Sequence, residues 1–173
     1  MNHYTMPKHR PRFCPCGGAA PGSPAPARAP HYEACCGRYI DAGLPAPNAW
    51  ELMRSRYSAY TLGASRYLLA TWATHTCPAD LDVIDGPRWL GLQILRFAEL
   101  DETHAEVEFV ARFKADGRMQ RLHETSRFLR GDDSRWRYVD GELSEVNCRN
   151  SVTHQPSEVR LAPGRRFSNP IEP

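Results

Sequence analysis

The chain has 173 residues, the length of one domain with a sizeable core, since domains commonly run about 100 to 150 residues. Its 22 Lys and Arg residues against 20 Asp and Glu give a formal net charge of +2, which excludes a protein that coats polyanions through charge alone. No stretch reaches the about 18 consecutive apolar residues of a membrane helix, and the first residues lack the apolar core of a secretory signal. We therefore expect a cytoplasmic protein with no membrane partner.

The amino-terminal segment is rich in proline. Nine of the 15 prolines fall within residues 1–47, where a fixed φ and missing N–H donors disfavour regular helix and sheet. Residues 17–30 are a low-complexity run of Ala, Pro and Gly, which predicts a solvated, partly extended linker. We expect the ordered body to begin near Asn48. The predicted division is 1–47 for a cysteine-containing segment, 48–142 for the main domain, and 143–173 for an extended or disordered tail.

Helical patterns begin at residue 48. Asn48 with Glu51 three positions later resembles a capping box, and good helix formers follow, which predicts a helix over 48–62 that ends at Gly63. A second helix is predicted over 65–74 because its large apolar residues have helical spacing. A short third helix is expected over 78–84.

The pattern then changes to that of strands. In residues 104–114 apolar and polar residues alternate, which is typical of a strand with one buried face. Turn-forming residues separate this strand from its neighbours and predict strands over 89–100, 103–114, 118–130 and 135–140. Helices followed by a meander of strands indicate an α+β fold, with helices packed on one face of a curved four-stranded antiparallel sheet.

Four of the six cysteines lie close together in the sequence. Cys14 and Cys16 form one pair, and Cys35 and Cys36 form a second pair after 18 intervening residues. In a reducing compartment such thiols favour metal binding, and four thiolates complete a closed tetrahedral zinc site that is structural. We expect one zinc ion per chain. A redox dithiol and a site without metal remain open, as does His31 as a substitute ligand.

The cysteine segment resembles the SEC-C zinc motif, through Cys14-Pro15-Cys16-Gly17 and through His31 to Gly37, with the sequence HYEACCG. Further segments resemble the YchJ family of bacterial proteins. They read GRY at 37–39, LMRSRYSAY at 52–60, YLLATW at 67–72, RWLGL at 88–92, HETSRF at 123–128 and WRYVDG at 136–141. The resemblance implies a zinc knuckle followed by a cone-shaped domain like that of nuclear transport factor 2 (NTF2). It implies no settled activity.

The chain departs from the family pattern in two ways. Most relatives have a short connection between the two cysteine pairs, whereas this chain inserts the Ala/Pro-rich run. Loop-closure entropy grows only logarithmically with length, so the insertion costs roughly 0.7 kcal/mol and does not argue against zinc. Many relatives also repeat the motif near the end of the chain, where this one has only Cys148. We therefore expect no second zinc site.

A polar pocket is predicted inside the cone. The alternation of residues 121–128 places Glu124 on the core side of its strand, together with Phe128. A buried carboxylate needs a partner, and the sequence offers Arg54, Arg56 and Tyr138. The functional interpretation makes Glu124 an acid or base. In that interpretation the pocket residues are Arg54, Tyr57, Glu124, Tyr138 and Asp140. The structural alternative is an Arg–Glu pair that ties a helix to the sheet.

No catalytic motif is present. Walker, G-x-S-x-G, G-x-G-x-x-G and H-E-x-x-H patterns are all missing, and His75 with Cys77 has no further metal ligands nearby. A closed zinc site does no chemistry, and the resemblance to the SEC-C motif implies a docking role. We therefore expect a protein-interaction adaptor rather than an enzyme, with Tyr32, Arg38 and Tyr39 of the knuckle as the docking surface for an unknown protein partner. The alternative is a small-molecule binder or enzyme that uses the cone pocket around Glu124.

Two further expectations concern partners. Basic residues near both ends of the chain could contact phosphates, although two solvated arms are the simpler explanation. These basic residues are Lys8, Arg10, Arg12, Arg160, Arg165 and Arg166. Nucleic acid is therefore a weak expectation. A homodimer that pairs through the exposed sheet face also stays open.

Overall fold

The computed structural model describes residues 10–81, 83 and 86–144. The helices are α1 (Gly37–Ile40), α2 (Ala49–Leu62) and α3 (Ser65–Ala70). The strands are β1 (Arg88–Glu99), β2 (His104–Ala115), β3 (Arg118–Arg130) and β4 (Trp136–Leu143). The predicted tail beyond residue 144, together with Lys8, Cys148 and the distal arginines, lies outside the described residues. No helix in the described ranges is long and apolar enough to cross a bilayer.

Helix α2 is the central element of the fold. Asn48 caps it by accepting a hydrogen bond from the Glu51 amide at 2.9 Å, and Gly63 ends it in the left-handed conformation with φ of 67°. The predicted start and end of this helix are therefore confirmed. Eight of its residues are buried, on most sides of the helix rather than along one stripe, and the side with Trp50, Arg54 and Thr61 is the more open one. Burial over most of the circumference indicates a helix largely enclosed by protein.

The second helix is shorter than predicted, and the third is not found. Helix α3 ends at Ala70 because the following residues pair with the sheet: Thr71 accepts a hydrogen bond from the Tyr138 amide at 2.9 Å, and the Ala73 amide donates to Tyr138 at 2.7 Å. Residues 78–81 and 83, the described part of the predicted 78–84 helix, are not helical. Tertiary pairing has overridden a helical pattern.

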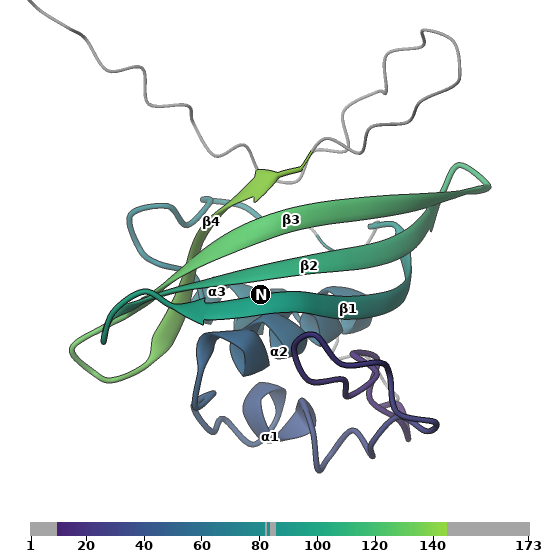
Figure 1. The fold of residues 1–173 in the computed structure, drawn as a ribbon, viewed down its shortest axis with the longest axis horizontal. Helices are drawn as coiled ribbons and strands as arrows, with labels where there is room; N and C mark the ends of the chain where they lie inside the picture. Colours follow the sequence, from purple (N-terminus) through teal and green to yellow (C-terminus); the bar gives the residue numbers. More distant parts are fainter. Residues whose placement is uncertain (1–9, 82, 84–85, 145–173) are drawn as a thin grey trace, which may run out of the picture.

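The four strands form one antiparallel sheet in the order β1-β2-β3-β4, as predicted. Each strand begins and ends within three residues of its predicted bounds. Two register shifts in β1, after Trp89 and after Ile94, bend this edge strand. Figure 1 shows the curved sheet in front of α2 and α3, with the amino-terminal segment beside β1. This α+β arrangement of helices on one face of a curved sheet is the one that the sequence predicts.

The amino-terminal segment packs against the main domain. The four cysteines and Tyr32 share one buried cluster with Leu52 and Met53 of α2 and with Leu92 and Ile94 of β1. The Ala/Pro-rich run differs from its prediction in part, because Ala19 is buried and the Gly22 amide donates to the Ile94 carbonyl at 3.1 Å. Residues 24–28 are exposed as expected. The insertion therefore covers a bulged, otherwise open sheet edge.

Candidate metal centre and cone cavity

Two backbone turns bring the cysteine pairs together. Phe13 and His31 form an antiparallel bridge, flanked by a hydrogen bond of 2.8 Å from the Cys14 amide to Pro30. The Tyr32 carbonyl accepts hydrogen bonds from the amides of both Cys35 and Gly37. A Cβ at Gly37 would lie 2.8 Å from this carbonyl oxygen, so only glycine fits there. The bridge brings the two pairs together, and the long insertion leaves from it as a loop.

The four sulfurs form a compact cluster. All four Sγ atoms lie within 4.8 Å of one another, and all four cysteines are buried free thiols. The Cys14–Cys16, Cys16–Cys35, Cys16–Cys36 and Cys35–Cys36 separations are 3.4, 3.6, 3.6 and 4.0 Å. A tetrahedral zinc ion with bonds of about 2.3 Å holds its sulfurs about 3.8 Å apart. The donor set and its spacing therefore fit a closed zinc site.

The thiols cannot all ionise without a cation. Hydrogen bonds from Cys16 and the other two cysteines hold the pKa of Cys14 below its usual range, whereas hydrogen bonding to Cys14 and burial hold the pKa of Cys36 above it. These opposite directions arise because buried thiols at this distance share protons. A divalent cation would remove that competition by taking all four as thiolates.

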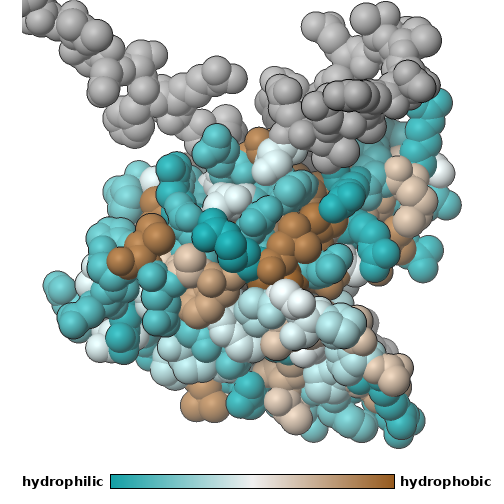
Figure 2. Space-filling view, viewed as in Figure 1, coloured by the Kyte–Doolittle hydropathy of each residue, from teal (hydrophilic) through white to brown (hydrophobic). Residues whose placement is uncertain are grey.

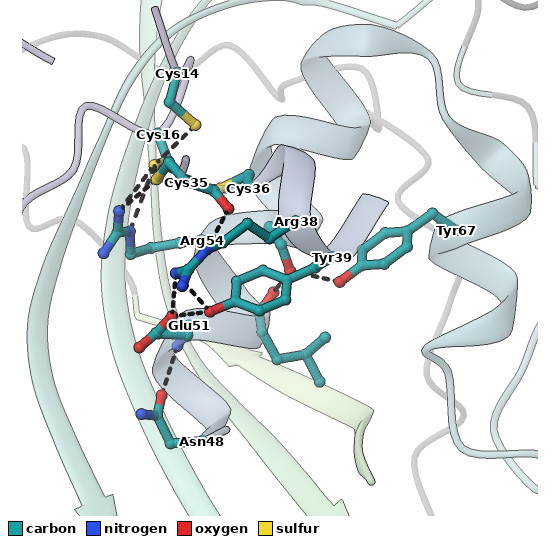
Figure 3. A network of polar contacts seen from close by, with 12 residues as sticks. Cys14, Cys16, Cys35, Cys36, Arg38, Tyr39, Asn48, Glu51, Arg54 and Tyr67 are labelled. Atoms are coloured by element: carbon teal, nitrogen blue, oxygen red, sulfur yellow. Dashed lines mark hydrogen bonds and ion pairs between the residues drawn. The ribbon is translucent and has the colours of Figure 1, made fainter. Parts of the chain in front are cut away.

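Helix α2 supplies two polar side chains to the cluster. The Arg54 guanidinium donates to the Cys16 sulfur at 3.4 Å and to the Cys35 sulfur at 2.9 Å (Figure 3). The Ser58 hydroxyl, one turn further along, lies 3.6 Å from the Cys14 sulfur. Burial by itself would lower the pKa of Arg54, but the neighbouring Cys16 and Cys35 sulfurs outweigh it and raise that pKa. A cation next to the cluster stabilises negative charge on its sulfurs.

The residues predicted as a docking surface are mostly buried. Tyr32 is 1% exposed and Tyr39 is 6% exposed. The Tyr39 hydroxyl donates to the Glu51 carboxylate, and Arg38 joins the same carboxylate at 3.4 Å (Figure 3). Of the three, only Arg38 is open to solvent. Tyr32 and Tyr39 hold the knuckle together because their rings fill its small core, a role that spacing alone does not reveal.

The other metal-ligating candidates lie apart from the cluster. His31 is exposed, with its ring 5.3 Å from that of Phe13, and it is not among the clustered ligands. Cys77 is half-buried and donates to the Pro78 carbonyl, while His75 is exposed. Within the described residues, the four cysteines are the only group of three or more His, Cys, Asp or Glu side chains close enough to share a metal ion.

A small cavity lies between α2 and the sheet. Of the predicted pocket residues, Tyr57, Glu124 and Tyr138 lie in its lining, and its volume is about 70 Å³. Pockets for metabolites of ordinary size run about 300 to 1,000 Å³, so this one admits a few waters or a ligand of several heavy atoms. Arg54 and Asp140 do not line it. Arg54 faces the sulfurs, and Asp140 pairs with Arg127 at 2.6 Å on the opposite face of the sheet.

Glu124 has hydroxyl partners rather than a direct arginine partner. Ser126 donates to its carboxylate at 2.6 Å, and the Tyr138 hydroxyl lies at 3.4 Å. Burial raises the pKa of Glu124, and hydrogen bonds from Ser126 and Tyr138 oppose that shift. Its carboxylate rests on the backbone of Gly141, where a Cβ would lie 2.0 Å from the nearest carboxylate oxygen. Gly141 is therefore part of this site. Only the register between β3 and β4 reveals its place there, and the sequence alone does not.

Arg56 is the cation of the cavity. It is 2% exposed, and its guanidinium lies 4.8 Å from the Trp72 ring centroid and 4.6 Å from that of Tyr138. One of its nitrogens donates to Leu68 and Thr71, both at 2.8 Å. Burial lowers the pKa of Arg56, and the charge of Glu124 acts against that shift. Arg56 lines the cavity from α2 and Glu124 lines it from β3, and within the described part of the chain neither residue forms an ion pair.

A wider groove lies between α1, α3 and the turn that joins β3 to β4. Its volume is about 1,140 Å³, and apolar residues such as Leu44, Leu69 and Trp136 line it. Four of the charges at its rim are neutralised in two ion pairs, Arg10 with Asp41 and Arg137 with Asp133. The groove brings no cluster of polar groups to one point, and it offers no evidence of a specific ligand.

Sequence comparison places this chain among proteins of bacteria. The family described as YchJ, middle NTF2-like domain, matches residues 48–141. A UPF0225 protein of Polaromonas naphthalenivorans is 52% identical over 131 residues, which span 75% of this chain and 96% of that protein. A UPF0225 protein of Cupriavidus pinatubonensis is 47% identical over 148 residues, 83% of this chain and 96% of that protein.

Two solved structures resemble the fold. The crystal structure of a SEC-C motif containing protein from Psychrobacter arcticus has a TM-score of 0.63 at 30% identity, and covers 82% of this chain and 85% of its own. The solution structure of a SEC-C motif containing protein from Rhodopseudomonas palustris has a TM-score of 0.61 at 29% identity, and covers 69% of this chain and 96% of its own. With its cysteine cluster and NTF2-like domain, the chain belongs to the YchJ-like family of SEC-C motif containing proteins.

Proposed function

We propose that this is a zinc-binding protein in which Cys14, Cys16, Cys35 and Cys36 hold one structural zinc ion. The observation that carries the proposal is the spacing of four buried sulfurs, all within 4.8 Å of one another. Four thiolates leave no open coordination position, so the ion would activate no water or substrate. Its role would be to fix the amino-terminal segment on α2 through Arg54 and Ser58.

A structural metal favours a binding role over catalysis. The protein would act as an adaptor, in a cytosolic compartment that keeps the thiols reduced. Because Tyr32 and Tyr39 are buried, the face of the knuckle that remains for a partner consists of exposed side chains such as Arg38, His31 and Glu33. A pull-down with wild type beside an Arg38→Glu variant tests this face. Recovery of the same partners by both would remove Arg38 from the docking surface.

Zinc content is the first experiment. The purified wild-type protein, a Cys16→Ser variant and a Cys77→Ser variant would be compared by elemental mass spectrometry. Cys77 is a matched control because it is a free cysteine outside the cluster. We expect about one zinc per chain in wild type and in Cys77→Ser, and much less in Cys16→Ser. No zinc in wild type, or equal zinc in all three, would overturn the proposal.

A second candidate function is binding of a small polar molecule in the cone cavity. Three polar groups converge on it: the buried Arg56, the Glu124 carboxyl group, and the Trp72 indole N–H, which is buried without a hydrogen-bond partner in the described structure. A buried donor without a partner costs about 1 to 3 kcal/mol, which a bound molecule or water would recover. At about 70 Å³ the cavity fits a molecule the size of acetate better than a metabolite.

Acetate is a suitable probe for this second candidate. Ligand-observed NMR would compare wild type with Trp72→Phe, which removes the unpartnered donor, and with Trp136→Phe, which changes an indole outside the cavity. Saturable acetate binding by wild type and Trp136→Phe, weakened about tenfold in Trp72→Phe, would support the site. Absence of saturable binding in wild type would count against it.

A further inference from the structure

The outer face of the sheet, which points away from α2, is divided into two halves of different charge organisation. Side chains on a strand alternate between faces, so the residues opposite the buried ones belong to this outer face. Figure 2 shows that hydrophilic residues cover much of the visible side of the molecule. In one half, each cation that β2 and β3 carry on this face has an acidic side chain beside it. In the other half the cations stand beside one another.

The first half is neutralised by ion pairs. Arg96 of β1 contacts Glu106 at 3.6 Å and Glu108 at 3.7 Å. His123 of β3 contacts Glu108 at 2.8 Å, and Arg127 forms two hydrogen bonds with Asp140 at 2.6 and 2.7 Å. This half of the face therefore presents little net charge to a partner.

The second half, which we call the basic quadrilateral, consists of Arg88, Arg112, Lys114 and Arg121. The strand register places Arg88 directly opposite Lys114, and Arg112 directly opposite Arg121. Arg112 and Lys114 are two residues apart on β2, so the two pairs are neighbours. All four side chains are exposed. Within residues 10–81, 83 and 86–144, none of the four takes part in an ion pair.

This arrangement has no structural benefit. Like charges directly opposite each other in a sheet destabilise it, whereas opposite charges at the same positions would stabilise it. The Arg112 guanidinium lies over Gly91 of β1, where a Cβ would come within 3.1 Å of it. This cation therefore leans from β2 toward β1, the strand that carries Arg88, and lies along the sheet surface. Two adjacent like-charge pairs indicate a surface shaped for an anionic partner.

The chemistry of the quadrilateral favours a phosphate backbone over other polyanions. Protein interfaces are usually built around an apolar or aromatic centre, whereas the exposed apolar side chains beside this patch are only Met119, opposite Lys114, and Leu90, fewer than its four cations. Binding to an anionic membrane commonly uses an exposed amphipathic helix, whereas eight of the 14 residues of α2 are buried. A second copy of the chain packed on this patch by two-fold symmetry would oppose like charges. A phosphodiester chain needs only cations that lie close together. Neighbouring strands of a sheet lie about 4.8 Å apart, and two residues that follow each other on one face of a strand lie about 6.6 Å apart.

We propose that the basic quadrilateral binds the phosphodiester backbone of a nucleic acid without reading its sequence. No aromatic side chain belongs to the quadrilateral, so the bases would not stack there as they do in single-strand binding domains. Four phosphate contacts on a single strand give a salt dependence with a slope of about −3 in log K against log salt concentration, at about 0.7 per contact. This site is separate from the cysteine cluster and from the cone cavity.

The experiment compares two double variants on the same sheet face. Arg112→Gln/Arg121→Gln removes half of the quadrilateral, and Arg96→Gln/Arg127→Gln removes the same charge from the neutralised half. Fluorescence anisotropy with labelled oligouridylate RNA, and with DNA of the same length, would be measured in the full chain between 50 and about 200 mM salt. Circular dichroism would verify that both variants are folded.

We expect wild type and the Arg96/Arg127 variant to bind with similar affinity. The Arg112/Arg121 variant should bind about tenfold more weakly at low salt, with a slope smaller by about 1.4. RNA and DNA should bind alike because only phosphates are contacted. Equal binding by both variants, or none by wild type, would overturn the proposal. Stronger binding to polyglutamate or to phosphatidylserine vesicles than to RNA would also overturn it, because the partner would then be of another class.

Discussion

The cysteine cluster and the cone cavity use side chains from adjoining faces of the same helix, α2. Arg54 and Ser58 of α2 face the sulfurs, whereas Arg56 and Tyr57 face the cavity. Both sites therefore set an arginine against groups that carry negative charge, half-buried in the case of Arg54 and buried in the case of Arg56. In the cluster the contacts are direct, at 2.9 to 3.4 Å, while in the cavity Arg56 and Glu124 stay apart.

The two sites differ in whether their own residues leave polar groups without a partner. The cluster supplies four equivalent ligands at the spacing of a tetrahedron, so a single ion satisfies it. The cavity contains a cation, a carboxyl group and an unpartnered indole N–H with space between them. A closed set of ligands indicates a structural role, whereas unmet polar groups around a space indicate that something small occupies it.

Removal of the metal from the cysteine cluster should lower the stability of the protein more than any other change. Structural zinc supplies about 10 to 16 kcal/mol of apparent binding energy in small modules. We expect chelation, or Cys16→Ser, to lower the free energy of unfolding by several kcal/mol and Tm by roughly 10 °C. Differential scanning calorimetry with and without chelator measures this. Cys77→Ser is the control, and an unchanged Tm after complete zinc removal would contradict the expectation.

Loss of Arg56, the cation of the cone cavity, should cause the second largest loss of stability. Arg56→Met leaves the Leu68 carbonyl and the Thr71 hydroxyl without their buried donor, and a buried polar group that loses its hydrogen-bond partner costs about 1 to 3 kcal/mol. Urea unfolding would give the free energy for Arg56→Met, Glu124→Gln and the double variant. We expect the double variant to recover about 1 to 3 kcal/mol relative to the sum of the single changes. Additive effects would show that the two groups do not interact. Arg66→Met, an exposed arginine of α3, is the matched control.

Loss of the cluster cation should affect metal affinity more than folding. Arg54→Met removes N–H donors from the Cys16 and Cys35 sulfurs but keeps the aliphatic stem. Groups that hydrogen-bond to metal ligands typically change metal affinity by about 10- to 100-fold. Competition with a chromogenic chelator would measure zinc affinity in Arg54→Met and Arg66→Met. Equal affinities would show that Arg54 does not stabilise the thiolates.

The smallest effect is a pH dependence that comes from Glu124. Burial raises its pKa above the ordinary value of 4.5, so the folded state keeps its proton after the unfolded state has lost it. The folded state then binds more protons, and the free energy of unfolding falls as pH rises from about 4.5 to the folded pKa. Arg56, Tyr60 and Tyr138 surround this group. The free energy of unfolding would be measured against pH for wild type and for Glu124→Gln. The difference between the two should decline over this pH range, and a difference that does not change with pH would contradict the expectation.

Local sequence patterns predict most of the fold. Asn48 and Gly63 delimit α2 because capping and left-handed backbone depend on the residue itself. Alternation predicts the strands and places Glu124 on the buried face, since side-chain direction follows a period of two. The cysteine pairs predict their own clustering because few other arrangements suit four thiols in a proline-rich segment.

Tertiary structure alone decides which neighbours these residues have. The sequence offers Arg54 and Arg56 as equal partners for Glu124, and only the packing of the knuckle on α2 directs Arg54 to the sulfurs and Arg56 to the cavity. Helix α3 stops early because its next residues pair with β4. Tyr32 and Tyr39 are buried because the knuckle closes over them, and Gly141 lies under Glu124 because of the β3–β4 register. Sequence thus determines local conformation and which face is apolar, whereas contacts between residues distant in sequence depend on how the elements pack.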